Sequence, residues 1–159
     1  MMSWMRWLGL ILAASFAMAQ GVPKTAPPKT IVFLCEHGAA KSVIAAAYFN
    51  KLAAERHLPF HAIARGTTPQ EDLSKSAVAG LEKDGVAFPN EKPKLLSPED
   101  ARRAVRVVAF CPVPDSLANK PVQKFDVPVP SEGYDKSRDE ILKHVRDLID
   151  QLAATPAAK

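Results

Sequence analysis

Apolar residues occur along the chain in two patterns, short unbroken runs and longer stretches with a helical repeat. The short runs are rich in β-branched and aromatic residues and predict buried strands; they cover Thr30–Leu34, Phe60–Ala64, Val105–Phe110 and Lys124–Val127. The stretches in which apolar residues recur every three or four positions predict helices; they cover Lys41–His57, Asp72–Asp84 and Asp135–Leu152. A short further helix is predicted from Ser97 to about Ala104, because Ser97 is a good N-cap and Pro98 suits the first helical position.

The order of these elements predicts the fold class. Strands and helices follow one another as β-α-β-α-α-β-β-α, and parallel neighbouring strands need crossover connections. We therefore expect a single-domain α/β protein with an open four-stranded parallel sheet and helices on both faces. The length of 159 residues suits one domain, and 47% hydrophobic with 24% charged residues is normal for a folded protein. This composition excludes a disordered chain, a multi-span membrane protein and a disulfide-dense mini-protein.

The first 19 residues have the features of an export signal. Arg6 supplies a positive charge, Leu8–Ala19 is an apolar run, and Ala17 and Ala19 are the small residues of a cleavage site. The run is shorter than the roughly 20 residues that a bilayer-spanning helix needs. We expect cleavage after Ala19, export to a bacterial periplasm and no stable membrane insertion; an uncleaved N-terminal anchor is the alternative. The predicted organisation is a signal peptide (1–19), a Pro-rich linker (20–29), the domain (30–153) and a flexible tail (154–159).

The net charge and the potential metal-ligating residues limit the partners and cofactors that the sequence predicts. The formal net charge of +4 is small and its basic residues are scattered, so no nucleic-acid partner is expected. His57, His61 and His144 lack metal-ligand spacing, so the sequence predicts no metal site. No organic cofactor is implied either.

Candidate chemistry lies in the turn after the first predicted strand, because ligands of open α/β sheets bind where a strand leads into a helix. A short loop of small residues lets successive backbone N–H groups face inward as a nest for an oxyanion, and the next helix adds the positive end of its dipole. Such a field favours the thiolate of Cys35, and Ser42 can donate to it. The predicted oxyanion-binding backbone is that of Glu36, His37, Gly38, Ala39, Ala40 and Lys41.

A different interpretation of Cys35 is a buried strand-end cysteine that packs as a small hydrophobe. The succession of strand, Cys, five residues, cation, Ser and helix favours the oxyanion site over that interpretation.

The stretch that carries this loop reads IVFLCEHGAAKSVIAAAYFNKLA, and it resembles the low-molecular-weight protein tyrosine phosphatases and the thioredoxin-coupled arsenate reductases. The family's loop reads Cys, five residues, Arg, Ser, directly after the first strand. The resemblance continues through Ala64-Arg65-Gly66-Thr67 and extends over roughly 30–152. It implies the family's fold, a thiolate nucleophile at Cys35, and a small oxyanion or phosphotyrosine-type substrate.

Two departures concern residues that the family uses in catalysis. The loop arginine is Lys41 here, and lysine offers one compact charge where arginine grips two oxygens with a planar fork. The family's general acid is an aspartate before proline on a late loop, where this chain has Val129. Valine cannot protonate a leaving oxygen, and loss of a general acid typically costs about 10²–10⁴-fold in rate.

Several other charged residues near these motifs have open roles. Asp126, Glu132 or Asp135 are candidate replacements for the missing acid, although Asp135 suits a helix cap better. Glu36 places a negative charge beside the nucleophile, which repels an anion unless its side chain points outward. A protonated His37 would offset that charge. Arg65 leaning over the anion site is a further hypothesis.

Cys111 follows the third predicted strand. If the sheet has the family's order, the first and third strands are neighbours about 4.8 Å apart, and the two cysteines are near disulfide separation. The resemblance implies a resolving thiol at Cys111 and a thiol reductant protein as partner, but the loop 112–123 lacks the reductases' further cysteine. A structural disulfide, or two reduced thiols without a role, is the alternative.

The sequence thus predicts an exported phosphatase or arsenate reductase-like enzyme in which Cys35 attacks an oxyanion, Lys41 neutralises it and Ser42 stabilises the thiolate. Two further hypotheses stay open. One is an anion-binding module without catalysis, and the other is a thiol redox protein that uses Cys35 and Cys111.

Overall fold

A computed structural model describes residues 27–154. The predicted signal peptide lies outside these residues, as do most of the predicted linker and all of the predicted tail except Ala154. The strands are β1 (Lys29–Cys35), β2 (Phe60–Gly66), β3 (Ala104–Ala109) and β4 (Val122–Lys124). The α-helices are α1 (Lys41–Glu55), α2 (Lys75–Lys83), α3 (Pro98–Arg103) and α4 (Tyr134–Ala154), with short 3₁₀ turns η1 (Asp115–Leu117) and η2 (Pro130–Glu132).

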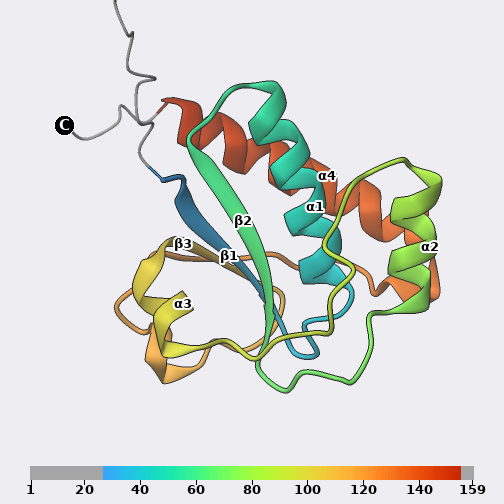
Figure 1. The fold of residues 1–159 in the computed structure, drawn as a ribbon, viewed down its shortest axis with the longest axis horizontal. Coiled ribbons are helices and arrows are strands. Elements are labelled where there is room, and N and C mark those ends of the chain that lie inside the picture. Colours follow the sequence, from blue (N-terminus) through green and yellow to red (C-terminus); the bar gives the residue numbers. More distant parts are fainter. Residues whose placement is uncertain (1–26, 155–159) are drawn as a thin grey trace, which may run out of the picture.

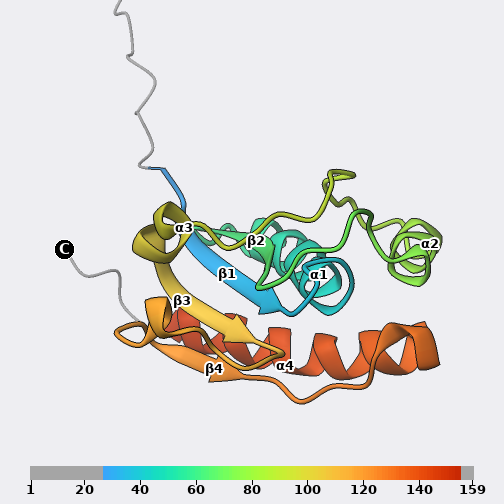
Figure 2. The same ribbon diagram turned by 90° about the horizontal axis from the view of Figure 1, so that it is seen from below.

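The four strands form one parallel sheet in the order β2-β1-β3-β4. The arrowheads of β1, β3 and β4 point the same way in Figure 2. The predicted fold class is therefore confirmed. With all strands parallel, their carboxyl ends share one edge of the sheet, and the turn after β1 lies at that edge beside the ends of β2 and β3.

Two apolar layers cover the sheet, because side chains of β1 alternate between its faces. Ile31 and Phe33 pack into the larger core with α1, α2 and α4, whereas Val32 and Leu34 pack into a smaller core under α3 and η1. Figure 1 shows α3 apart from the other three helices. Helices cover both faces, as predicted, and β1 is buried at the centre.

The boundaries of several elements differ from the predicted ones. The fourth strand was expected at Lys124–Val127 but ends at Lys124, because Phe125 and Val127 turn into the larger core instead of continuing the ladder. The second helix begins at Lys75 rather than Asp72. The last helix begins at Tyr134, so Asp135 lies inside its first turn and is not its cap. The N-cap at Ser97 is confirmed, with a complete capping box to Asp100.

None of the helices within residues 27–154 combines the length and apolarity that a membrane span requires. The same residues contain no group of three or more His, Cys, Asp or Glu side chains placed to hold a metal ion.

Candidate functional site: a thiol beneath a loop of unpaired amides

Cys35 and Ser42 meet at the carboxyl edge of the sheet. Cys35 is the last residue of β1 and is 7% exposed, and Ser42 lies in the first turn of α1 and is fully buried. The Sγ atom of Cys35 lies 3.0 Å from the Oγ atom of Ser42. The two atoms are within hydrogen-bonding distance, and either of them can be the donor.

The loop between these two residues turns its carbonyl groups outward. Four of its carbonyls accept hydrogen bonds from backbone N–H groups of the segment that follows β2. The pairs are Thr67 to Cys35 (3.2 Å), Thr68 to Glu36 (2.8 Å), Gln70 to His37 (3.3 Å) and Ser74 to Ala39 (3.0 Å). Because the carbonyls point to this segment, the amides between them are directed elsewhere.

Within residues 27–154, the backbone N–H groups of the same loop have no hydrogen-bond partner. Across the described residues, no N–H from Glu36 to Val43 donates to a backbone or side-chain acceptor. The residue before α1, Ala40, has no side chain that could cap the helix. Successive free amides and a helix N-terminus are groups that can bind a negatively charged ligand.

Two glycines allow the loop to lie against the end of β2. Gly38 has φ of +63°, and a Cβ atom there would fall 2.8 Å from the backbone nitrogen of Gly66. A Cβ on Gly66 would fall equally close to the nitrogen of Gly38. Gly38 was expected from the sequence as a loop residue with positive φ; the role of Gly66 was missed, because its closeness to Gly38 is a tertiary contact.

Cys111 lies two residues after the end of β3, beside the nucleophile. The Cys111 thiol contacts the carbonyl oxygen of Leu34, with 3.9 Å between sulfur and oxygen, and Leu34 directly precedes Cys35. Both cysteines are free thiols in this structure. Burial, together with the nearby charge of the Cys35 sulfur, raises the pKa of the Cys111 thiol.

Lys41 begins α1, but its side chain does not turn toward the loop amides. Its Nζ atom donates to the carbonyl oxygen of Val127, at 2.9 Å, on the loop after β4. The expectation that Lys41 faces the anion therefore differs from its observed contact. The ammonium stays at the N-terminus of α1 and links two loops that are distant in the sequence.

Solved structures with this arrangement of strands and helices are known, whereas no protein-family model and no curated protein matches the chain. The arsenate reductase from Archaeoglobus fulgidus has a TM-score of 0.63 and 24% identity, over 76% of this chain and 98% of that one. A low-molecular-weight phosphotyrosine phosphatase from Vibrio cholerae has a TM-score of 0.69 and 16% identity, over 80% and 99%. The thioredoxin-dependent arsenate reductase Cg_ArsC1' of Corynebacterium glutamicum has a TM-score of 0.65 and 20% identity. The match covers 80% of this chain but only 63% of that enzyme.

The chain has the fold of the low-molecular-weight phosphatases and arsenate reductases. The resemblance suggested by the sequence is thereby confirmed at the level of the fold. The loop with unpaired amides occupies the position that this resemblance implies, directly after the first strand.

In the part of the chain that the structure describes, no carboxylate of the loop after β4 hydrogen-bonds to Cys35. Val129 is 38% exposed and stands between two prolines. Asp126 and Glu132 are exposed, and within residues 27–154 neither carboxylate hydrogen-bonds to Cys35 or Ser42. Asp135 forms ion pairs with Lys83 and Arg138. None of the three candidate acids is therefore positioned by the structure at the sulfur.

Three charged residues near the site face away from it. Arg65 forms two hydrogen bonds with the carboxylate of Asp100, at 2.8 and 3.1 Å, and a third with the carbonyl of Ala64. The hypothesis that Arg65 leans over the anion site is wrong, because its guanidinium is committed to the start of α3. The side chains of Glu36 and His37 are exposed at the rim of the loop.

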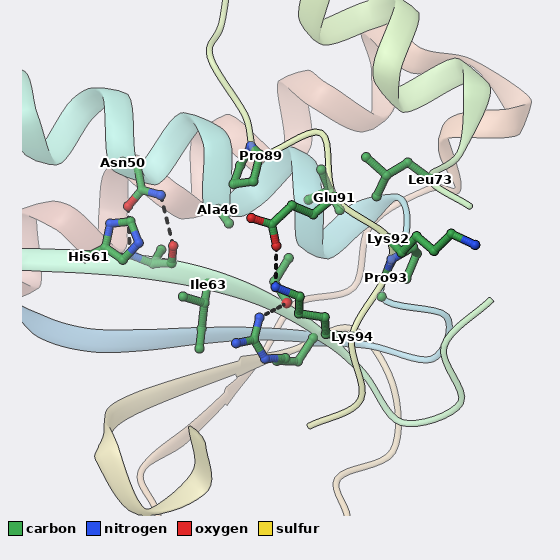
Figure 3. A pocket seen from close by; sticks show the side chains of 15 residues that line it. Ala46, Asn50, His61, Ile63, Leu73, Pro89, Glu91, Lys92, Pro93 and Lys94 are labelled. Atoms are coloured by element: carbon green, nitrogen blue, oxygen red, sulfur yellow. Dashed lines mark hydrogen bonds and ion pairs between the residues drawn. The ribbon is translucent and has the colours of Figure 1, made fainter. Parts of the chain in front are cut away.

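A separate cavity of about 260 Å³ lies along the outer edge of β2, between α1 and residues 89–94. In Figure 3 the Asn50 carboxamide faces β2, and it caps the Ala62 N–H and C=O groups at 2.7 and 2.9 Å. Leu73 and Pro89 form part of the apolar wall of the cavity, and Glu91 forms an ion pair with Lys94 at its rim. Neither Cys35 nor Cys111 lines this cavity.

The Gly38–Gly66 contact leads to a prediction about stability and anion binding. Gly38→Ala should reduce the free energy of unfolding by more than the roughly 1–2 kcal/mol that a positive φ costs alanine, because its Cβ also collides with the Gly66 backbone. Phosphate affinity should fall with it, since the amides are displaced. Urea unfolding and isothermal calorimetry with inorganic phosphate measure the two effects.

Gly85→Ala is the matched control. Gly85 also has φ of +63°, but a Cβ there would have no atom within 4 Å. This variant should show the cost of the positive φ alone and unchanged phosphate affinity. Equal losses in the two variants would contradict the close approach of the loop to β2.

Proposed function

We propose that the protein is a cysteine-dependent enzyme that acts on a phosphorus or arsenic oxyanion. The observation that carries the proposal is the Cys35 sulfur, hydrogen-bonded to Ser42 at a loop whose amides have no partner among the described residues. Fixed amide dipoles that face a developing negative charge stabilise it without reorganisation. A thiolate at the base of the loop is placed to attack the central atom of the bound group.

The reaction that this arrangement supports begins with attack of the Cys35 thiolate on phosphorus. A sulfur–phosphorus bond forms, the bond to the leaving oxygen breaks, and the leaving group takes the electron pair. The loop amides hold the transferred oxygens, and the Ser42 hydroxyl stabilises the thiolate before attack and after its release. Water then hydrolyses the thiophosphoryl enzyme to phosphate and regenerates the thiolate.

The position of Cys111 favours a second candidate, arsenate reduction. Cys35 would displace water from arsenate and form a sulfur–arsenic bond. Cys111 would then attack the Cys35 sulfur, so that a disulfide forms, the sulfur–arsenic bond breaks and its electron pair reduces As(V) to As(III). The two thiols supply both electrons, and an external dithiol protein must reduce the disulfide before the next turnover. The contact of Cys111 with the Leu34 carbonyl supports this step.

We also propose that the protein is exported. The charge at Arg6, the apolar run up to Ala19 and the small residues at the cleavage site support this localisation. In an oxidising compartment a Cys35–Cys111 disulfide would block the nucleophile. Steady activity there therefore requires a thiol reductant as partner.

The phosphatase proposal predicts that the wild-type protein, kept reduced, hydrolyses p-nitrophenyl phosphate and that Cys35→Ala abolishes the reaction. Ser42→Ala should lower kcat by about tenfold or more, because the thiolate loses a hydrogen bond worth roughly 1.5–3 kcal/mol. Release of p-nitrophenol measures both, and inorganic phosphate should inhibit competitively. Turnover no higher in wild type than in Cys35→Ala would contradict hydrolysis; phosphate binding without turnover would then indicate an anion-binding module.

The arsenate proposal predicts one equivalent of arsenite per reduced protein without added reductant, and a Cys35–Cys111 disulfide as the other product. Cys111→Ser should abolish arsenite release while leaving p-nitrophenyl phosphate turnover. Because the pKa of Cys111 is raised, its attacking thiolate becomes more abundant as pH rises, and single-turnover release should accelerate between neutral and alkaline pH. A disulfide that forms equally fast without arsenate would indicate a thiol redox protein instead.

The export proposal predicts that the full chain, expressed in a Gram-negative host, is recovered from the periplasm with Gln20 as its first residue. Mass spectrometry of the intact protein measures the cleavage site. Ala19→Arg blocks the signal-peptidase motif and should leave the chain unprocessed. A wild-type protein that retains Leu8–Ala19 in the membrane fraction would support the uncleaved anchor and contradict cleavage.

A further inference from the structure

The loop that carries Val129 is fastened to the nucleophile loop and to α4. Lys41 Nζ donates to the Val127 carbonyl at 2.9 Å, and the fully buried Ser137 donates from its Oγ to the Pro128 carbonyl at 2.8 Å. Two consecutive carbonyls are thus bound from opposite sides. Pro128 and Pro130 restrict the backbone further, because each fixes its own φ.

The far end of this loop is fastened as well. Tyr134, at the start of α4, donates to Asp84 at 2.9 Å, and its ring lies so close to Gly80 that a Cβ there would fall 2.2 Å from it. Arg138 binds the same carboxylate at 3.1 Å. A loop fixed at both ends presents one set of side chains to the site.

Among residues 125–130 of this loop, no acidic side chain hydrogen-bonds to Cys35 or Ser42. Phe125 and Val127 are buried in the larger core, whereas Asp126 between them is exposed. Val129, without a proton to give, occupies the acid position implied by the family pattern.

Other carboxylates close to the loops are already engaged. Asp84 accepts from Tyr48 and Tyr134, and Asp100 is bound by Arg65. Glu36 is the remaining acidic side chain on the nucleophile loop, and its charge reaches Cys111 electrostatically. It is exposed at the rim, and no hydrogen bond joins its carboxylate to another described residue.

We infer that this site transfers phosphoryl groups only from compounds whose leaving group departs without an added proton. The substrate class is acyl phosphates and phosphate esters of acidic phenols, and it excludes phosphoserine and phosphotyrosine type esters as efficient substrates. This inference rests on the proposed phosphatase function and narrows its substrate. The sulfur–phosphorus bond forms, the phosphorus–oxygen bond breaks, and a carboxylate or phenolate anion leaves with the electron pair and is protonated by water if at all.

The test is the dependence of kcat/KM on the leaving group, measured with acetyl phosphate and a series of aryl phosphates from nitro-substituted to unsubstituted phenol. The wild type should show a steep fall in kcat/KM as the phenol becomes less acidic. Val129→Asp should raise kcat/KM for phenyl phosphate by about 10²-fold or more, the usual contribution of a general acid. In this variant kcat/KM should depend less on the acidity of the phenol, and activity should be lost at alkaline pH.

Val129→Asn is the matched control, since it has the shape of aspartate without the proton, and it should behave as the wild type does. Because Val129 is exposed, all three proteins should unfold at similar urea concentrations. If kcat/KM of the wild type did not depend on the acidity of the phenol, the inference would be overturned. If Glu36→Gln then made kcat/KM depend steeply on that acidity, Glu36 would be identified as the acid. Absence of Cys35-dependent turnover with every compound, acetyl phosphate included, would overturn the proposed function itself.

Discussion

The structure depends on the way in which one loop distributes its backbone hydrogen bonds. The carbonyls of Cys35, Glu36, His37 and Ala39 bind the segment after β2, and the intervening amides are thereby left for another partner. A backbone amide without a protein partner needs another acceptor, either water or a ligand. The accumulation of such amides at the end of β1, above a sulfur, is explained most simply by a negatively charged ligand.

The same constraint explains the close packing around the loop. Carbonyls of one loop can reach amides of the next segment only if the two backbones nearly touch, and Gly38 and Gly66 allow this contact. The parallel sheet then brings Cys111 to the same edge, beside Leu34. In the proposed reactions the Cys35 sulfur attacks the anion, and the Cys111 sulfur attacks that of Cys35.

The departures from the family pattern concern the later steps of the reaction rather than anion binding. The cradle consists of backbone groups, and it tolerates the change from arginine to Lys41, which fastens the Val127 carbonyl instead. Proton delivery depends on a specific side chain, and the loop presents Val129 at that point. A site of this kind retains a nucleophile and an anion nest while the range of leaving groups narrows.

The sequence alone determined the alternation of strands and helices, the parallel sheet, and the loop from Cys35 to Ser42, because these features follow from local patterns of apolar residues, glycine and small side chains. It left the end of the fourth strand misplaced, because the core packing of Phe125 and Val127 overrides their strand-like pattern. Only the tertiary structure decided the partners of Lys41, Arg65 and Ser137. Each of these side chains binds a group that is brought within reach by folding, and spacing along the chain carries no information about such contacts.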